Sequence, residues 1–450
     1  MTKASEKTFL GHPIGLFVLF FTEMWERFSY YGMRALLILY MSKELIVNAR
    51  DGSTIYGFEF VEMLFPGKNV EQLASLVYGL YTFLVYCTPL AGGFIADRYL
   101  GQKKTIIIGG ALMMIGHFLM AFEPVFLVAL VFIIFGNGAF KPNISTQVGD
   151  LYPEGDPRRD GAFTIFYMGI NLGAIFSGLV CGTLGELYGW HYGFAAAGIG
   201  MAIGLVVYMF GQKYLAGSQA KHKANLSKES HEPLTKGQWK GIIGIIVLSF
   251  SNLVFWGVFE QQGNTMQQLS TNNTDWSVGS LFTMPSTWLQ VINPLFIVLL
   301  ATAMMGLWDK MGKRQPSSIK KMSIGAILLG VGFIFLVIPT MGFTPDMKMS
   351  FLWFLPAMFI VTIGELCFSP IGLSMVTKVA PARYVGLLMG WWFFSMAGGN
   401  FFGGYLGTYY SDAEWAKSEF FGLMVVLGVA LGVAIFLMER PLKKAVGENI

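Results

Sequence analysis

The chain has 450 residues, of which 54% are hydrophobic and only 13% are charged. A water-soluble globular protein of this length needs more charged residues than these to form its polar exterior. The composition therefore excludes a soluble globular protein and indicates one embedded in lipid. The net charge of +4 is small, and the positions of the basic residues along the chain carry more information than their total.

Twelve apolar stretches follow one another along the chain, each about as long as a helix that crosses the hydrocarbon core of a bilayer. The 55 Gly and 40 Phe residues fit helices that pack closely inside a membrane. We therefore predict an all-α membrane protein with twelve transmembrane helices. The predicted spans lie near residues 13–40, 73–96, 105–121, 125–147, 162–185, 192–212, 240–262, 282–306, 319–340, 351–377, 384–409 and 420–438.

A polar stretch rich in Lys and Ser, residues 217–238, separates six apolar stretches from six. Residues 93–104 and 306–314 follow the second and eighth stretches with the same pattern: an acidic residue beside a basic one, then Gly and a basic pair. The same loop at the same place in each half indicates a duplication. We predict an N-terminal six-helix bundle over 1–214, a cytoplasmic linker over 215–239 and a C-terminal six-helix bundle over 240–450.

The basic residues gather on one side of the predicted membrane. If both termini are inside, most of the 31 Lys and Arg residues fall in cytoplasmic segments and few in outer ones. This asymmetry is typical of spanning proteins, because basic loops resist translocation. It predicts a multi-pass protein with both termini in the cytoplasm. Nothing in the long outer segment, residues 42–72, identifies a ligand.

The first stretch carries charges, unlike the plain apolar centre of a cleaved signal peptide, so we expect it to stay in the mature protein. A charge at the bilayer centre costs at least about 2.5 kcal/mol on insertion scales, so these side chains need a reason to be there. They fall within an arc of roughly 140° on one helix face, which must look into the bundle or a watery cavity. The polar side chains of this face are Glu23, Glu26, Arg27, Tyr30, Tyr31 and Arg34.

Glu23 and Arg27 are four residues apart, the spacing of an ion pair within a helix, so Glu26 needs a cation from elsewhere. Lys141 in the fourth stretch can supply it, and Glu365 in the tenth places an acid in the other half. The charges could be ion pairs that hold helices together, but buried pairs are a poor source of stability. Carboxylates that exchange between a basic partner and an unpaired state can instead tie proton binding to a conformational step.

Other classes of membrane protein find little support. Cys87, Cys181 and Cys367 each lie inside an apolar stretch, with no CxxC pair and no clustered His to hold a metal ion. We find no nucleophile placed beside a base, so we do not expect an enzyme. A channel would show a repeated selectivity ring or pore loop, whereas this chain has two halves with lone, unlike charges.

Several motifs resemble those of the proton-coupled oligopeptide transporter (POT, or peptide transporter) family of the major facilitator superfamily. Residues 23–32, EMWERFSYYG, look like the family's ExxERFxYYG first-helix motif, and residues 166–173, FYMGINLG, are similar to its FYxxINxG signature. Ala174 and Glu260 depart from common family residues without a change of charge. The short linker predicts twelve spans rather than the fourteen of many bacterial members. Further matching runs are 141–143, 255–263, 293–294 and 364–370.

The resemblance implies how this sequence would bind a peptide. In the family the matching cations bind the peptide carboxylate, which implies Arg34 and Lys141 here, and the tenth-helix acid binds the amine, which implies Glu365. Lys141 would also belong to a proton-coupling group with Glu23, Glu26 and Arg27. Further substrate contacts implied by the resemblance are Tyr30, Tyr86, Asn171, Trp256, Asn293 and Trp392.

The implied function is a proton-coupled symporter that imports di- and tripeptides by alternating access, with the peptide ends held by opposite charges at the midplane. The alternative is a relative that carries nitrate or another small organic anion. Such a relative need not keep an acid for a substrate amine, so Glu365 favours peptides. We expect short peptides, protons and membrane lipid as partners, no nucleic acid, no metal or other cofactor, and function as a monomer in a bacterial inner (cytoplasmic) membrane.

Overall fold

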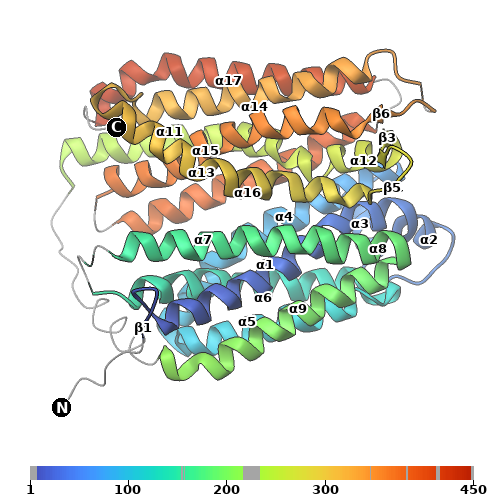
Figure 1. Ribbon diagram of the computed structural model, residues 1–450, viewed down its shortest axis with the longest axis horizontal. Helices are drawn as coiled ribbons and strands as arrows, with labels where there is room; N and C mark the ends of the chain where they lie inside the picture. The colour runs from blue at the N-terminus through green and yellow to red at the C-terminus, as the bar shows by residue number, and fades with distance from the viewer. Residues whose placement is uncertain are drawn as a thin grey trace. The chain divides into compact units, whose positions relative to one another are not determined.

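The computed structural model of the protein describes residues 8–153, 156, 158–215, 234–344, 346–381, 384–411 and 416–446. Within these ranges twelve helices have 18 or more residues, which agrees with the predicted number of spans (Figure 1). They are α1 (Ile14–Tyr40), α4 (Val70–Ile95), α5 (Gln102–Leu119), α6 (Phe126–Asp150), α7 (Arg158–Ser177), α9 (Trp190–Gly211), α11 (Lys236–Phe259), α13 (Leu289–Met311), α14 (Ser318–Thr340), α15 (Phe354–Val379), α16 (Val385–Tyr410) and α17 (Lys417–Val446).

Shorter elements join or extend the long helices. Three are π-helical: η1 (Met41–Leu45), η2 (Ala96–Leu100) and η4 (Gly178–Gly182). The short α-helices are α2 (Ile46–Arg50), α3 (Phe58–Leu64), α8 (Thr183–Tyr188) and α12 (Thr265–Asn272). The 3₁₀ turns are η3 (Glu123–Val125), η5 (Gln212–Tyr214), η6 (Glu260–Gln262), η7 (Ser286–Trp288), η8 (Gly312–Arg314) and η9 (Phe351–Trp353).

In the described part of the chain, six two-residue strands form three pairs. The pairs β1–β2 and β4–β5 are antiparallel, and β3–β6 is parallel. Their bounds are β1 (Thr8–Phe9), β2 (His12–Pro13), β3 (Thr274–Asp275), β4 (Ser277–Val278), β5 (Phe282–Thr283) and β6 (Met349–Ser350).

The predicted spans differ from the helices by several residues at many ends, and two of them show why. The span predicted at 240–262 overlaps α11, which ends at Phe259, after which the polar run of η6 and α12 continues as separate helices. The span predicted at 282–306 was wrong at its start, because α13 begins only at Leu289. Gly279, in the left-handed region at φ 56°, closes the β4–β5 hairpin, and Pro285 follows it.

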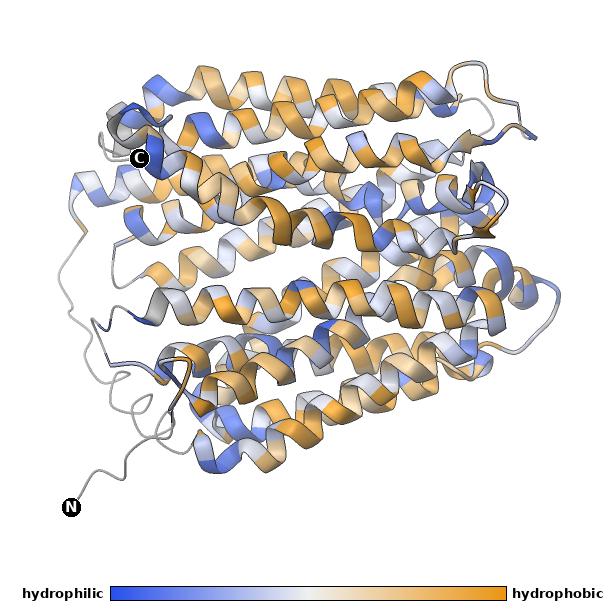
Figure 2. Cartoon of the chain, in the orientation of Figure 1, coloured by the Kyte–Doolittle hydropathy of each residue, from blue (hydrophilic) through white to orange (hydrophobic). Residues whose placement is uncertain are grey.

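The long helices differ in their mean hydropathy. By length and composition, nine helical segments of the described part of the chain can cross a membrane, and α1, α5 and α16 are not among them. In α1 the charged residues lower the average. Figure 2 shows apolar residues along most of the helices.

The Cα positions divide the chain into two compact units. Unit 1 comprises Met1–Tyr40, Val47–Met63 and Cys87–Glu229, and unit 2 comprises Met41–Ile46, Leu64–Tyr86 and Ser230–Ile450. Helix α4 therefore contributes to both units. Residues 216–233, most of the predicted linker, lie outside the described residues, so the bundle boundaries at 214 and 240 stay predictions.

Close approach of backbones at glycines holds each unit together. In unit 1, α1 packs against α7 and α9, and α4 touches α6 so closely that a Cβ on Gly92 would lie 1.9 Å from the carbonyl oxygen of Gly138. In unit 2, α14 runs beside α15 and α17 (Figure 1), and a Cβ on Gly330 would lie 2.7 Å from the carbonyl oxygen of Val425. The packing explains why glycine is so frequent in this chain.

Candidate functional site

Helix α1 buries two carboxylates around one guanidinium. Glu23, Glu26 and Arg27 are only 2%, 0% and 3% exposed. Arg27 Nε lies 3.1 Å from Glu23 Oε1, and Arg27 Nη2 donates to Glu26 Oε1 at 2.8 Å. Arg27 Nε also pairs with Glu26 Oε2. The ion pair predicted between Glu23 and Arg27 is present, and Arg27 also binds Glu26, the acid for which we predicted a cation from another helix.

The two carboxylates differ in how completely they are bound. Helix α6 adds Asn137, whose Nδ2 donates to Glu26 Oε1 at 3.2 Å. Both oxygens of Glu26 therefore accept hydrogen bonds. Glu23 Oε2 is buried and has no hydrogen-bond partner within the described residues. An ionised carboxylate only accepts hydrogen bonds, so Glu23 Oε2 differs from both oxygens of Glu26 in having no donor bound to it among the described residues.

Glycine on α7 brings a second helix against this turn of α1. A Cβ on Gly173 would lie 2.2 Å from the carbonyl oxygen of Met24 and 3.0 Å from Arg27 Cβ. A larger residue would push α7 away, which gives a physical reason for the glycine that ends the FYMGINLG run. Tyr30 and Tyr31 complete the surroundings, with ring centroids 5.1 and 6.0 Å from Arg27 Cζ.

Lys141 belongs to the same electrostatic group. It lies on α6, four residues after Asn137, and is within electrostatic range of Glu23, Glu26, Arg27 and Arg34. The structure therefore brings together the predicted cations and acids of unit 1, and Arg27 forms hydrogen bonds to both oxygens of Glu26.

Two further predicted residues of unit 1 lie inside the helix packing. Tyr30 is 1% exposed. Asn171 is buried on α7, and its Nδ2 donates to the carbonyl oxygen of Tyr167 at 3.0 Å. The amide of Asn171 thus bonds to its own helix in this structure, and its contact with substrate stays a prediction.

Unit 2 contains a different acidic site. Glu365 lies half-buried on α15, and Asn293 of α13 donates from Nδ2 to Glu365 Oε2 at 3.0 Å. The same Nδ2 lies 3.0 Å from Thr362 Oγ1. In the part of the chain that the structure describes, Glu365 has neutral hydrogen-bonding neighbours and no ion pair. Asn293 was predicted as a substrate contact, whereas the structure places it on the carboxylate predicted to bind the amine.

The three predicted aromatic residues of unit 2 pack in or against its core. Trp256 is buried on α11, and Trp392 on α16 packs so tightly on Gly372 that a Cβ there would lie 2.5 Å from Trp392 Cζ2. Tyr86 is half-buried beside the same core. A packing role is therefore present for all three, and their role as substrate contacts stays a prediction.

Sequence reasoning gave no role to a further buried acid. Glu260, the first residue of η6, is 2% exposed, and its Oε2 accepts a hydrogen bond from the Tyr78 hydroxyl at 3.3 Å. It also interacts electrostatically with Glu365. The signal was present in the sequence, because Glu260 is a charge inside a predicted span, but it was considered only as a variant of a motif.

Comparisons with known proteins identify the family of this chain. Residues 103–231 and 218–421 match the POT family, also designated PTR2. The chain is 35% identical to the uncharacterized transporter YclF of Bacillus subtilis (strain 168), over 98% of this chain and 96% of that protein. It is 31% identical to the di-/tripeptide transporter of Lactococcus lactis subsp. cremoris, over 99% of this chain and 98% of that protein.

A solved structure extends the likeness to three dimensions. The crystal structure of a mutant of the peptide transporter POT in complex with alafosfalin has a TM-score of 0.85 and 33% identity to this chain. The match covers 98% of this chain and 97% of that one. The chain therefore belongs to the POT family, whose members are multi-pass membrane transporters of the major facilitator superfamily fold and not enzymes.

Proposed function

We propose that the protein is a proton-coupled symporter that imports di- and tripeptides by alternating access. The observation that carries the proposal is the buried group of Glu23, Glu26 and Arg27, in which Glu23 Oε2 is unpartnered within the described residues. Membership of the POT family and the di-/tripeptide transporter of Lactococcus lactis among its relatives support the substrate class.

The proton is bound by the two glutamates of α1. Arg27 compensates the charge of one carboxylate fully and shares its Nε with the other, so the group has one acid more than its nearest cation can neutralise. Burial makes the excess negative charge costly, and a proton or a second cation removes it. Proton binding therefore changes which charged side chains need a partner of opposite charge. Such a change can couple proton binding to a conformational step.

The peptide is bound by its two charged ends. Arg34 and Lys141 of unit 1 bind the carboxylate, because a guanidinium donates two parallel hydrogen bonds and an ammonium adds a point charge. Glu365 of unit 2 binds the amine. Its support by Asn293, without an ion pair among the described residues, favours this role, since a cationic amine would complete it. Fixed charges at the ends leave the side chains of the peptide weakly selected.

Lys141 links the two binding events. While a glutamate of α1 is ionised, Lys141 remains attracted to it, and the electrostatic interaction of Lys141 with Glu23 and Glu26 supports this step. A proton on the glutamate weakens that attraction and frees Lys141 for the peptide carboxylate. The protonated, loaded carrier is thereby favoured over the half-loaded forms, so coupling arises from differential binding between states.

Transport of nitrate or another small organic anion is the weaker candidate. Such a substrate has no amine, so Glu365 would keep a costly, uncompensated charge without a ligand to offset it. Glu365 and its Asn293 donor therefore favour a substrate with a cationic end.

The location follows from the same proposal. The basic residues of the sequence favour a bacterial inner membrane with both termini in the cytoplasm, where loops rich in Lys and Arg are retained. Each monomer carries both the Glu23 group and Glu365, so we propose that the monomer is the functional form, with peptides, protons and membrane lipid as its partners.

Uptake of labelled dipeptides by reconstituted vesicles tests this function. We expect accumulation above the outside concentration when a proton gradient is directed inward, and competition by unlabelled di- and tripeptides. A protonophore that collapses the gradient should stop accumulation while exchange of peptide against peptide continues. Accumulation that persists after the gradient is collapsed, or competition by nitrate but not by peptides, would contradict the proposal.

A further inference from the structure

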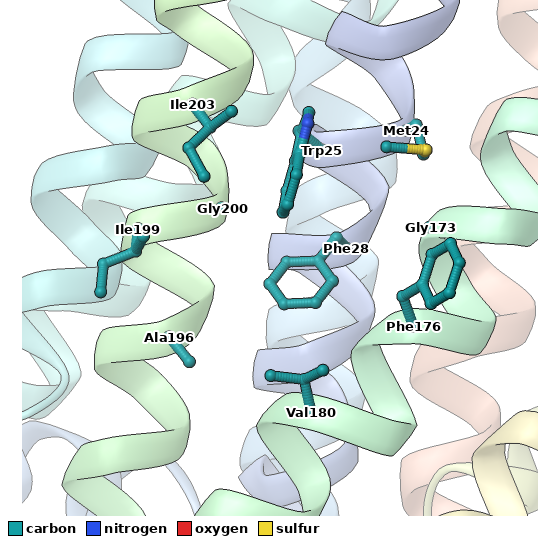
Figure 3. A pocket seen from close by; sticks show the side chains of 10 residues that line it. All are labelled: Met24, Trp25, Phe28, Gly173, Phe176, Val180, Ala196, Ile199, Gly200 and Ile203. Carbon is teal, nitrogen blue, oxygen red and sulfur yellow. The ribbon is translucent and has the colours of Figure 1, made fainter.

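A cavity of about 450 Å³ lies in unit 1 on the side of α1 that faces away from the charged group. In an α-helix, Met24, Trp25 and Phe28 lie on a face roughly opposite to that of Glu23 and Glu26. Helices α7 and α9, together with η4, form the walls (Figure 3). The residues that line it are Met24, Trp25, Phe28, Gly173, Phe176, Val180, Ala196, Ile199, Gly200 and Ile203.

Glycines on the two wall helices let them approach α1 closely and so fix the floor of the cavity. Gly173 on α7 and Gly200 on α9 both line it. A Cβ on Gly200 would lie 2.4 Å from Phe28 Cδ1, and one on Gly204 would lie 3.0 Å from Trp25 Cβ. Helix α9 therefore approaches α1 closely, and the aromatic rings of α1 form a rigid floor that Figure 3 shows between the two wall helices.

The apolar lining of the cavity, the side to which it opens and its course along α9 indicate what it binds. All ten lining residues are apolar side chains or glycine, so neither a peptide nor an ion finds a partner there. The wall residues Phe176, Val180 and Ile199 are 46%, 41% and 54% exposed, on helices apolar enough to span a membrane, so the opening faces hydrocarbon. From Ala196 to Ile203 the groove follows α9 for about 10 Å, the direction in which lipid chains run.

An aliphatic chain fits these properties best. An apolar cavity of about 150 Å³ already holds a molecule of the size of benzene, so this one has room for a considerably longer hydrocarbon. An empty groove would forfeit the contacts of its lining atoms. In a membrane the abundant aliphatic molecules are phospholipids, whose chains lie parallel to the helices.

We propose that the groove between α1, α7 and α9 binds one acyl chain of a membrane phospholipid as an ordered ligand. Three walls hold the chain, whereas a lipid on a flat helix surface is held on one side only. Because lipid tails are as apolar as the groove, the preference over bulk lipid comes from packing and not from the hydrophobic effect, so it is modest. Binding needs no peptide and no proton, so it can be tested apart from the proposed transport function.

Quenching of Trp25 fluorescence by brominated lipid measures the occupancy directly. Full-length protein in detergent is titrated with phosphatidylethanolamine whose acyl chains carry bromine at mid-chain, and the Trp25→Phe variant supplies the signal to subtract. We expect the Trp25 emission to fall saturably, with about one lipid bound per protein, and to recover when the same lipid without bromine is added in excess.

A matched pair of variants locates the site. Val180→Phe places a ring in the groove and should raise the half-saturating lipid concentration at least about tenfold. Val206→Phe makes the same change on α9 outside the groove, at a residue that is 44% exposed, and should leave the titration unchanged. If Val180→Phe does not yield folded protein, Ala196→Leu fills the same space.

The proposal fails if quenching does not saturate, or if it is equal in the wild type and in both Val variants, because either result describes lipid that surrounds the protein without a site. It also fails if Trp25 is not quenched. Light scattering adds a further check: a wild-type dimer that Val180→Phe converts to a monomer would assign the groove to a second copy of the chain.

Discussion

The acids of the two units are held in opposite ways. In unit 1, Glu23 and Glu26 share the guanidinium of Arg27, and all three side chains are buried. In unit 2, Glu365 is half-buried and is held by the neutral amide of Asn293, with no ion pair among the described residues. One acidic group therefore has its counter-charge built in, and the other lacks one.

The difference suits the two acidic groups to different tasks, proton binding in unit 1 and binding of the peptide amine in unit 2. When both carboxylates are ionised they carry one negative charge more than Arg27 offsets, and a proton removes that excess, which suits a group that responds to the proton gradient. A carboxylate that lacks a counter-charge is ready for one brought by a ligand, such as a peptide amine. We therefore expect changes in unit 1 to affect coupling and changes at Glu365 to affect affinity.

Loss of a carboxylate in unit 1 should have the largest effect. Glu23→Gln and Glu26→Gln keep the shape but not the proton-binding group, so each should abolish gradient-driven accumulation of peptide. Exchange of peptide against peptide should persist in part, because exchange need not return an empty, deprotonated carrier. Uptake and exchange by the same vesicles provide the measurement. Gradient-driven accumulation by both variants at the wild-type level would contradict the assignment.

Removal of the acid in unit 2 should weaken binding without uncoupling it. A hydrogen bond to a charged group is worth about 1.5 to 3 kcal/mol, so Glu365→Gln should bind free peptides about tenfold or more weakly. It should also discriminate less against peptides with a blocked amine, which the wild type should bind poorly. Competition assays with free and blocked peptides test both statements. If the wild type binds the two kinds of peptide equally, Glu365 is not an amine ligand.

The side-chain amides of Asn293 and Asn137, which donate to Glu365 and Glu26, test the difference between the two acidic groups by a smaller effect. Asn293 is the hydrogen-bond donor to Glu365, so Asn293→Ala should weaken peptide binding severalfold. Asn137 adds one bond to Glu26, which Arg27 already holds with two, so Asn137→Ala should change peptide affinity by less than about threefold. Titration of both variants with the same dipeptide compares them. Equal losses would show that the two acids do not differ as described.

The sequence predicted the residue types of the site better than their contacts. The periodicity of α1 correctly placed Glu23, Glu26 and Arg27 on one face, because helical spacing follows from the sequence alone. It could not predict that Arg27 would reach back to Glu26, since the conformation of a long side chain depends on its neighbours. Asn137 and Asn293 were missed as donors to the acids because their partners lie on other helices.

The long helices were predictable for a similar reason, and their ends were not. Twelve apolar stretches suffice to place twelve helices, because each needs about twenty apolar residues to cross a membrane. The end of α11 at Phe259 and the start of α13 at Leu289 depend on local turns and on packing of polar residues such as Gln261, which donates to two backbone carbonyls. Hydropathy contains no such information.

Peptide affinity as a function of pH most directly tests whether unit 1 binds the proton while Glu365 of unit 2 binds the peptide amine. Between about pH 5 and 7 the amine and carboxyl groups of a peptide stay charged, so a change in affinity belongs to the protein. We expect wild-type affinity to rise as the pH falls, because protonation of the glutamates frees Lys141 for the peptide carboxylate. Glu365→Gln should bind more weakly at every pH with the same trend, and Lys141→Ala should show little trend. Identical pH profiles in the wild type and Lys141→Ala would contradict the account and leave Lys141 as a static packing charge.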